Sequence, residues 1–223
     1  MTSKNLTVRF YTITLCMICF LGILSYPIVI FNWGDKPYTG TTVKTSGAGS
    51  GTGDIMASLI QTGAGYVLKA HSDFWLVLNK VEMSDPEALN YTELTTLVMS
   101  TRTSLASAIS TYKNLKMLAD SMPYDPGMIE VLMQFDYNAL NASRPHNQSV
   151  WGEVKQFLIT GDVRGVFTKS LSTLEEIYRM VDTVYYSVSN KVYPDIKALW
   201  SLGTLFSDSH LFGQYSAEVF SEL

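Results

Sequence analysis

An uncharged run of 25 residues, Phe10 to Gly34, lies near the N-terminus and constrains the fold more than any other feature. A helix needs about 20 apolar residues to cross the hydrocarbon core of a bilayer, and Tyr11 to Phe31 supplies that length. A cleaved signal peptide has a shorter apolar core, of about 7–15 residues, followed by small residues at the cleavage site. We therefore predict an uncleaved transmembrane helix over residues 10–34.

Two basic residues, Lys4 and Arg9, precede this run, and no acidic residue occurs before Asp35. Basic residues next to a membrane span favour the cytoplasmic side. We therefore predict a cytoplasmic N-terminus over residues 1–9 and an extracytoplasmic C-terminal domain, either periplasmic or extracellular. Arg9 and Trp33 are expected to mark the two membrane interfaces, because tryptophan is enriched in the interfacial aromatic belt.

The charge balance and the cysteines exclude several classes of function. The formal net charge of −4 becomes −6 when Lys4 and Arg9 are left out, whereas a nucleic-acid-binding domain normally carries a basic face. Both cysteines, Cys16 and Cys19, lie inside the apolar run. The outer domain can therefore form neither a disulfide nor a cysteine zinc site. We expect no nucleic-acid partner and no cofactor, and the composition does not decide whether a small molecule binds.

A stretch rich in glycine and threonine follows the apolar run, with glycines at positions 40, 47, 49, 51 and 53. Such a composition behaves as a flexible coil, and we predict a linker over residues 35–54. The glycines do not lead into the Gly-Lys-Ser/Thr sequence of a phosphate-binding loop, and no strand precedes them. Nucleotide binding is therefore not expected here.

Three long segments carry apolar or small residues at alternating steps of four and three, the spacing of helices that pack against one another. In the first segment these are Met56, Ile60, Gly63, Val67, Ala70, Phe74, Val77 and Val81. In the second they are Leu94, Val98, Thr101, Leu105, Ala108, Tyr112, Leu115, Ala119 and Met122. In the third they are Phe167, Leu171, Leu174, Tyr178, Val181, Tyr185, Val188 and Val192.

Capping residues and prolines indicate where these helices begin and end. The first helix is expected to start at Asp54 and to stop at Ser84-Asp85-Pro86, and the second to stop at Met122-Pro123. The later helices are expected over residues 126–140, 150–159 with Ser149 as its cap, 163–192, 194–202 and from Ser209 onward. No stretch alternates as a strand does. We therefore predict an all-α fold, an antiparallel helical bundle over residues 55–223 with three long helices.

The sequence shows no pattern of catalytic or metal-binding residues. The three histidines, His71, His146 and His210, are far apart, and neither a Glu-x-x-His pair nor a Gly-x-Ser-x-Gly turn occurs. The neighbours Glu175 and Glu176 would point about 100° apart on a helix, which does not make an acid–base pair. We expect a protein that is not an enzyme and that binds no metal.

Aromatic residues are concentrated towards the C-terminus, and not all of them fit the helix seams. Aromatic side chains are enriched at protein interfaces, so two interpretations stay open for these residues, a docking surface or ordinary core. The candidates for a docking surface are Tyr186, Trp200, Phe212, Tyr215 and Phe220.

Three Asn-x-Ser/Thr triplets occur in the outer domain and begin at Asn90, Asn141 and Asn147. Such triplets accept N-linked glycans in secreted domains. The alternative is chance, because the chain is rich in serine, threonine and asparagine.

Together these features favour a single-pass, membrane-anchored, non-catalytic accessory or scaffolding subunit whose extracytoplasmic bundle docks on a larger membrane protein assembly. Its expected partners are the lipid bilayer and other membrane protein subunits. One alternative is a ligand-sensing bundle, although the chemoreceptor bundles that look similar continue into a second membrane helix, and no second apolar run occurs in this sequence. The other alternative is a surface glycoprotein that engages another chain.

Overall fold

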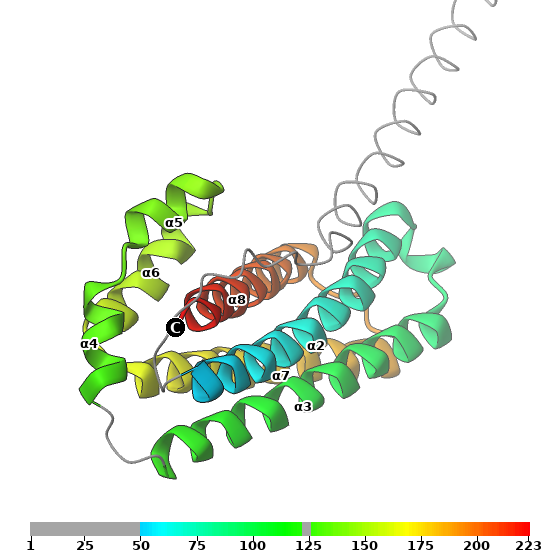
Figure 1. Ribbon diagram of the computed structural model, residues 1–223. Helices are drawn as coiled ribbons and strands as arrows, with labels where there is room; N and C mark the ends of the chain where they lie inside the picture. The colour runs from blue at the N-terminus through cyan, green and yellow to red at the C-terminus, as the bar shows by residue number, and fades with distance from the viewer. Residues whose placement is uncertain (1–49, 122–125) are drawn as a thin grey trace, which may run out of the picture. The chain divides into compact units, whose positions relative to one another are not determined.

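The computed structural model describes residues 50–121 and 126–223. These residues form helices joined by short connections, with no strand in either described range, which confirms the all-α prediction (Figure 1). The long helices are α2 (Ser50–Met83), α3 (Tyr91–Ser121), α7 (Val163–Ser189) and α8 (Ile196–Ser221). The short ones are η1 (Pro86–Ala88), α4 (Pro126–Gln134), α5 (Tyr137–Ser143) and α6 (Gln148–Ile159).

The four long helices form a ring in which α2 packs against α3 and α8, and α7 packs against the same two helices. Neighbours run antiparallel. Lys80 near the end of α2 pairs with Glu93 at the start of α3, and Asp120 at the end of α3 pairs with Arg164 at the start of α7. The short helices α4, α5 and α6 gather at one end of the bundle, where α6 packs against α7 and α8 (Figure 1).

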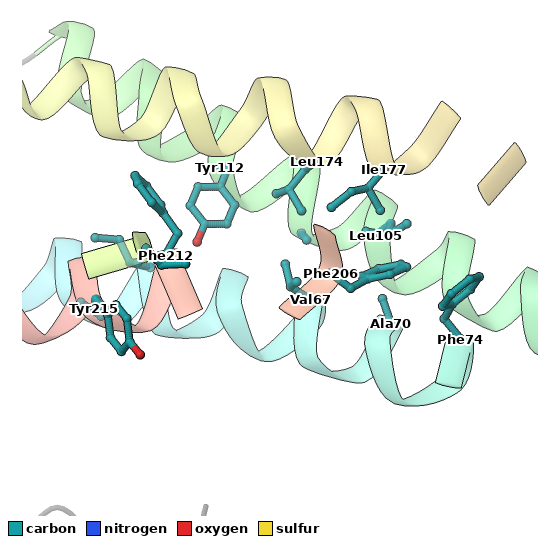
Figure 2. Packing of buried hydrophobic residues seen from close by; sticks show 14 of the residues in the cluster. Val67, Ala70, Phe74, Leu105, Tyr112, Leu174, Ile177, Phe206, Phe212 and Tyr215 are labelled. Carbon is teal, nitrogen blue, oxygen red and sulfur yellow. The ribbon is translucent and has the colours of Figure 1, made fainter. Parts of the chain in front are cut away.

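The predicted seams of α2 and α3 are confirmed, because each of their described positions is buried. Met122, the last position of the second seam, lies outside the described residues. Figure 2 shows Val67, Ala70 and Phe74 of α2 directed into the same interior as Leu105 and Tyr112 of α3. The interior of the bundle is therefore lined by the residues whose spacing had predicted a helix seam.

The predicted seam of α7 is wrong at every second position. Leu171, Tyr178 and Tyr185 are only partly buried, and Val192 is exposed beyond the end of the helix. The buried positions are instead the preceding residues, including Ser170, which donates its hydroxyl to the carbonyl oxygen of Val166 at 3.0 Å. Serine is a polar residue and is normally expected at the surface, but this hydrogen bond within the helix satisfies its hydroxyl group, so its burial costs little free energy. The other two buried residues of this kind are Ile177, which precedes Tyr178, and Val184, which precedes Tyr185.

The C-terminal region forms one helix, α8, where two were predicted. The triplet Ser207-Asp208-Ser209 resembles a helix start, but it lies in the middle of α8. The apolar residues before and after the triplet pack against the bundle, and such packing outweighs local capping preferences. The bundle therefore has four long helices rather than three.

Two other helix boundaries also differ from the prediction. The helix expected over 126–140 is divided, because Asp136 caps a new helix by accepting hydrogen bonds from the backbone N–H groups of Asn138 and Ala139. The cap of α6 is Asn147 rather than Ser149, since the Asn147 side chain accepts from the backbone N–H groups of Ser149 and Val150.

The end of the predicted linker is helical, because α2 begins at Ser50. Gly53 is buried against α8, and a Cβ atom there would lie 3.0 Å from the carbonyl oxygen of Phe220. The predicted linker thus includes the first turn of α2, and its remaining residues, 35–49, lie outside the described ranges.

The predicted membrane span over residues 10–34 also lies outside the described residues, as do Arg9 and Trp33. Among the helices of the described ranges, none combines the length and the apolarity that a bilayer crossing needs.

Candidate functional site

Three of the five candidate docking residues lie in the core, so of the two interpretations left open for them the core interpretation applies. Phe212, Tyr215 and Phe220 are each buried. Phe220 stacks on Phe167 of α7 with ring centroids 6.1 Å apart, and Tyr215 accepts a hydrogen bond from the backbone N–H of Asn147 at 2.9 Å. The sequence could not show this burial, because it depends on α6, the loop before it and α7 packing against the end of α8.

The other two predicted docking residues are exposed, but they lie on different helices. Tyr186 of α7 is 63% exposed and meets the ring of Tyr185. Trp200 of α8 is 43% exposed and meets the ring of Trp75 on α2 edge-on, with centroids 5.5 Å apart. The structure therefore does not gather the five residues into one surface, and it places Trp200 beside a tryptophan that the sequence did not single out.

Exposed apolar side chains continue along α2 from this tryptophan pair. We define the aromatic face as Trp75 and Trp200 together with the exposed residues Leu68, Leu76 and Met83. Residues seven or eight apart return to the same side of a helix, so the α2 members form one stripe. The sequence of α2 contains these residues as a second set of apolar positions beside the core seam. Only the packed structure shows that α8 leaves this second set partly uncovered.

A chain of ring contacts connects the aromatic face to the core. Trp75 meets His71 edge-on at 6.3 Å. His71 stacks nearly parallel on Phe206 of α8, with centroids 5.8 Å apart and an interplanar angle of 9°. Phe206 in turn contacts Phe74 at 5.3 Å. The exposed Trp200 and the partly buried Trp75 are therefore held by packed rings rather than by flexible neighbours, which suits a preorganised binding surface.

His71 and His210 both lie in the contact between α2 and α8. Nδ1 of His210 is 3.0 Å from the carbonyl oxygen of Ala64. Because a carbonyl can only accept, this nitrogen carries the hydrogen. Burial, together with a smaller effect of the nearby His210, lowers the pKa of His71 to about 4. Burial also lowers the pKa of His210, against the opposing effect of the hydrogen bond to Ala64. Both imidazoles are therefore neutral at pH 7.

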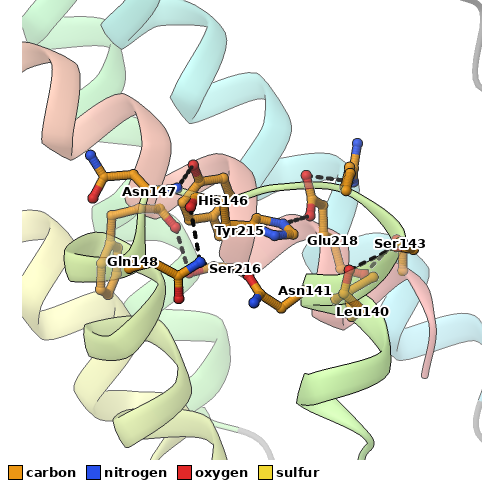
Figure 3. A network of polar contacts seen from close by, with 12 residues as sticks. Leu140, Asn141, Ser143, His146, Asn147, Gln148, Tyr215, Ser216 and Glu218 are labelled. Carbon is orange, nitrogen blue, oxygen red and sulfur yellow. Dashed lines mark hydrogen bonds and ion pairs between the residues drawn. The ribbon is translucent and has the colours of Figure 1, made fainter.

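A second cluster joins the loop before α6 to the end of α8 (Figure 3). Glu218 accepts from Nε2 of His146 at 2.7 Å with one carboxylate oxygen and pairs with Arg144 at 2.5 Å through the other. The His146 ring also stacks on Trp151, with centroids 4.5 Å apart.

An imidazole that is oriented by a carboxylate also occurs in catalytic sites, where its second nitrogen exchanges a proton with the substrate or nucleophile. Such a role requires that this second nitrogen be accessible. Nδ1 of His146 is buried, and it has no hydrogen-bond partner among the described residues. A substrate could not reach this nitrogen without displacing the loop. The cluster therefore fastens the loop to α8 rather than forming an open catalytic site.

The three glycosylation triplets differ in accessibility. Asn90 and Asn147 are exposed, whereas Asn141 is partly buried. The side-chain oxygen of Asn90 accepts from the backbone N–H of Glu93, and that of Asn141 accepts from Gln148. A glycan is attached to the side-chain nitrogen, so these bonds alone do not block modification. Exposure favours Asn90 and Asn147 over Asn141.

Within residues 50–121 and 126–223, no three histidine, cysteine, aspartate or glutamate side chains come together as metal ligands would. The chain matches no protein-family model, no curated protein and no solved structure.

Proposed function

We propose that this protein is a single-pass, membrane-anchored, non-catalytic accessory or scaffolding subunit whose extracytoplasmic bundle docks on a larger membrane protein assembly through the aromatic face. The observation that carries the proposal is the exposed Trp200 packed against Trp75 beside an exposed apolar stripe. Tryptophan and methionine are enriched in the centres of protein interfaces, and a few such residues supply most of the binding energy.

The membrane anchor in this proposal comes from the uncharged run at residues 10–34. Residues 35–49 separate that run from the start of α2 at Ser50. A flexible coil of this length has a mean reach of about 20 Å. Such a tether would hold the bundle near other proteins of the same membrane, which raises its effective concentration for a partner there.

The central experiment is site-specific photocrosslinking of the full-length chain in its own membrane. A crosslinking residue at position 76 or 200 is expected to capture the same membrane protein. A crosslinker at Met117, which is more exposed than either position but lies on α3, is the control and is expected to capture nothing reproducibly. Equal capture from all three positions, or a clean monomer in mild detergent, would contradict docking through the aromatic face.

Two substitutions separate docking from folding. Trp200→Ala is expected to weaken association with the captured protein while the helix content stays unchanged, because the side chain is at the surface. Phe212→Ala is expected to lower stability, because this side chain lies in the core. Lost helicity in Trp200→Ala would show that its ring is needed for the fold.

The topology needs a test of its own. Protease added outside intact cells is expected to digest the bundle, and sequencing of the mature protein is expected to find residues 10–34 retained. A mature chain that begins after Trp33 would rule out the anchor.

A second candidate function, a surface glycoprotein that engages another chain, is supported by the exposure of Asn90 and Asn147. Treatment of the natively produced protein with an N-glycosidase is expected to shift its mobility under this candidate. Asn90→Gln should remove one step of the shift, and Asn141→Gln should remove none.

A further inference from the structure

All three histidines of the chain contact α8 or lie within it, but they differ in what surrounds them. His146 has the carboxylate of Glu218 beside it at 2.7 Å. His71 and His210 instead meet a phenylalanine ring and a backbone carbonyl. A positive charge on His146 would therefore face a counter-charge, whereas a charge on His71 or His210 would not.

The acidic groups near the α2–α8 contact are directed elsewhere. On α2, Asp73 lies two residues after His71, but its carboxylate bonds to Lys69 and to Ser100 of α3. On α8, Asp208 lies two residues before His210, and the charge that acts on it is Glu153 of α6.

The remaining titratable groups at this contact do not supply a negative charge either. From α3, Tyr112 reaches the contact at Gly63 and Gly213, and burial raises its pKa, so it stays neutral. The carboxylate of Glu218 on α8 already pairs with Arg144 and His146. The electrostatic neighbour of His71 is His210, which would repel it when both are charged.

We propose that the α2–α8 contact is a pH-sensitive switch in which protonation of His71 and His210 releases the first part of α8, Ile196–His210, from α2. The proton on His210 would be added at Nε2, because Nδ1 already carries the hydrogen donated to Ala64. Two positive charges would then lie in a contact built from aromatic rings and small residues. Burial without a counter-charge disfavours the charged form, so acid favours the separated arrangement.

The last part of α8 stays attached in this switch. Phe220 stacks on Phe167 of α7, and Phe212 meets Phe157 of α6. Glu218 holds the loop residues Arg144 and His146. None of these contacts includes His71 or His210, so acid does not act on them through the same groups.

Release would separate Trp75 from Trp200 and uncover Phe206 and Phe74, which are buried in the packed structure. The pKa of His71 is about 4 in the packed state and 6.5 ordinarily. Each unit of pH between these values therefore shifts the equilibrium towards release by up to about tenfold through this one group. The switch does not require that the aromatic face bind a partner.

The test is hydrogen–deuterium exchange of the full-length chain in lipid nanodiscs between pH 7 and pH 4.5, corrected for the intrinsic effect of pH on exchange. Peptides from residues 196–210 and 64–78 are expected to lose protection at least tenfold as the pH falls. Peptides from residues 212–221 and from α3 and α7 are expected to keep it. Equal protection of residues 196–210 at both pH values, or loss of protection in all helices together, would overturn the switch.

Variants show whether the histidines are responsible. His71→Phe keeps a ring to stack on Phe206, and His210→Asn keeps an N–H group that can donate to Ala64. The double variant is expected to keep residues 196–210 protected at pH 4.5. His71→Phe alone, which changes less of the packing, is expected to lower the pH of release. His146→Gln is the control and is expected to leave that pH unchanged. Release of the double variant at the wild-type pH would overturn the proposal.

Discussion

The two most extensive contacts between helices that do not follow one another in the chain, α3 with α7 and α2 with α8, are built from different chemistry. Between α3 and α7, Arg102 pairs with Asp182 at 2.6 Å and lies over the ring of Tyr185. Lys113 also pairs with Glu175. Every ion pair that the described residues form between two long helices has α3 as one partner.

Between α2 and α8 the contact consists of stacked rings and small residues. A Cβ atom on Gly213 would lie 2.7 Å from the hydroxyl of Tyr112 and 3.1 Å from Cβ of Ala64. The two helices can come this close only because neither carries a larger side chain there. We expect the α3–α7 contact to respond to salt and the α2–α8 contact to respond to changes in volume and to acid.

The largest expected effect is the loss of a ring from the α2–α8 contact. Phe206→Ala should lower the free energy of unfolding by about 3–5 kcal/mol, because it removes a fully buried aromatic side chain. Tyr185→Ala, which removes a partly buried ring from the α3–α7 contact, should have a clearly smaller effect. Urea denaturation followed by circular dichroism measures both. Equal losses would show that the two contacts do not differ in the way described.

Acid is expected to have the next largest effect, and it should act on the α2–α8 contact. The folded pKa of His71, about 4, lies below the ordinary 6.5. As the pH falls, the unfolded chain therefore binds this proton at a higher pH than the folded chain does. The stability that neutral His71 contributes above pH 6.5 is lost as the pH falls towards 4. After allowance for the partial exposure of the ring, the loss is about 2 kcal/mol. Denaturation at pH 7 and pH 4.5 should show a smaller difference for His71→Phe than for the wild type.

A pair of glycine substitutions tests the close approach around Tyr112. A Cβ atom on Gly63 would lie 2.7 Å from the Tyr112 ring, whereas one on Gly65 would meet nothing within 4 Å. Gly63→Ala should destabilise by about 1–3 kcal/mol through overpacking. Gly65→Ala should stabilise by about 0.5–1 kcal/mol, because alanine is the better helix former. If thermal unfolding finds that both variants shift the same way, the crowding argument fails.

The smallest expected effect concerns the ion pair between α3 and α7. Arg102 and Asp182 are both partly exposed, so a double-mutant cycle with Arg102→Met and Asp182→Asn should give a coupling energy of about 1 kcal/mol or less. The coupling should decrease at 1 M salt, where the screening length is about 3 Å. A coupling that is independent of salt would indicate that the Arg102 contact with the tyrosine rings dominates.

Local spacing predicted α2 and α3 well, because both helices present one continuous apolar seam. It failed on α7, where Tyr178 and Tyr185 look apolar but lie beside the seam with their rings near Arg102. Ser170 looks polar but is buried. An aromatic residue with a hydroxyl can sit at the edge of a core and a serine can bond to its own helix, so residue type alone does not decide between neighbouring positions.

The candidate site was predicted only in part. The sequence singles out Trp200 but not its partner Trp75, and it does not decide whether Phe212, Tyr215 and Phe220 belong to a surface or to the core, where the structure places them. Whether an aromatic side chain is core or surface depends on what covers it. Here α6 and the loop before it cover Phe212 and Tyr215, and α7 covers Phe220. All of these elements are remote in sequence from the residues that they cover.

The sequence by itself determined that the described chain is helical and which faces of α2 and α3 are buried, because these follow from residue spacing along one helix. Only the tertiary structure decided that α8 runs unbroken, that its end is covered, and that His71 and His210 share one contact without a carboxylate. These features depend on distances between helices. Such distances are set by how side chains from separate segments fill the space between them, and the pattern along any one segment does not contain them.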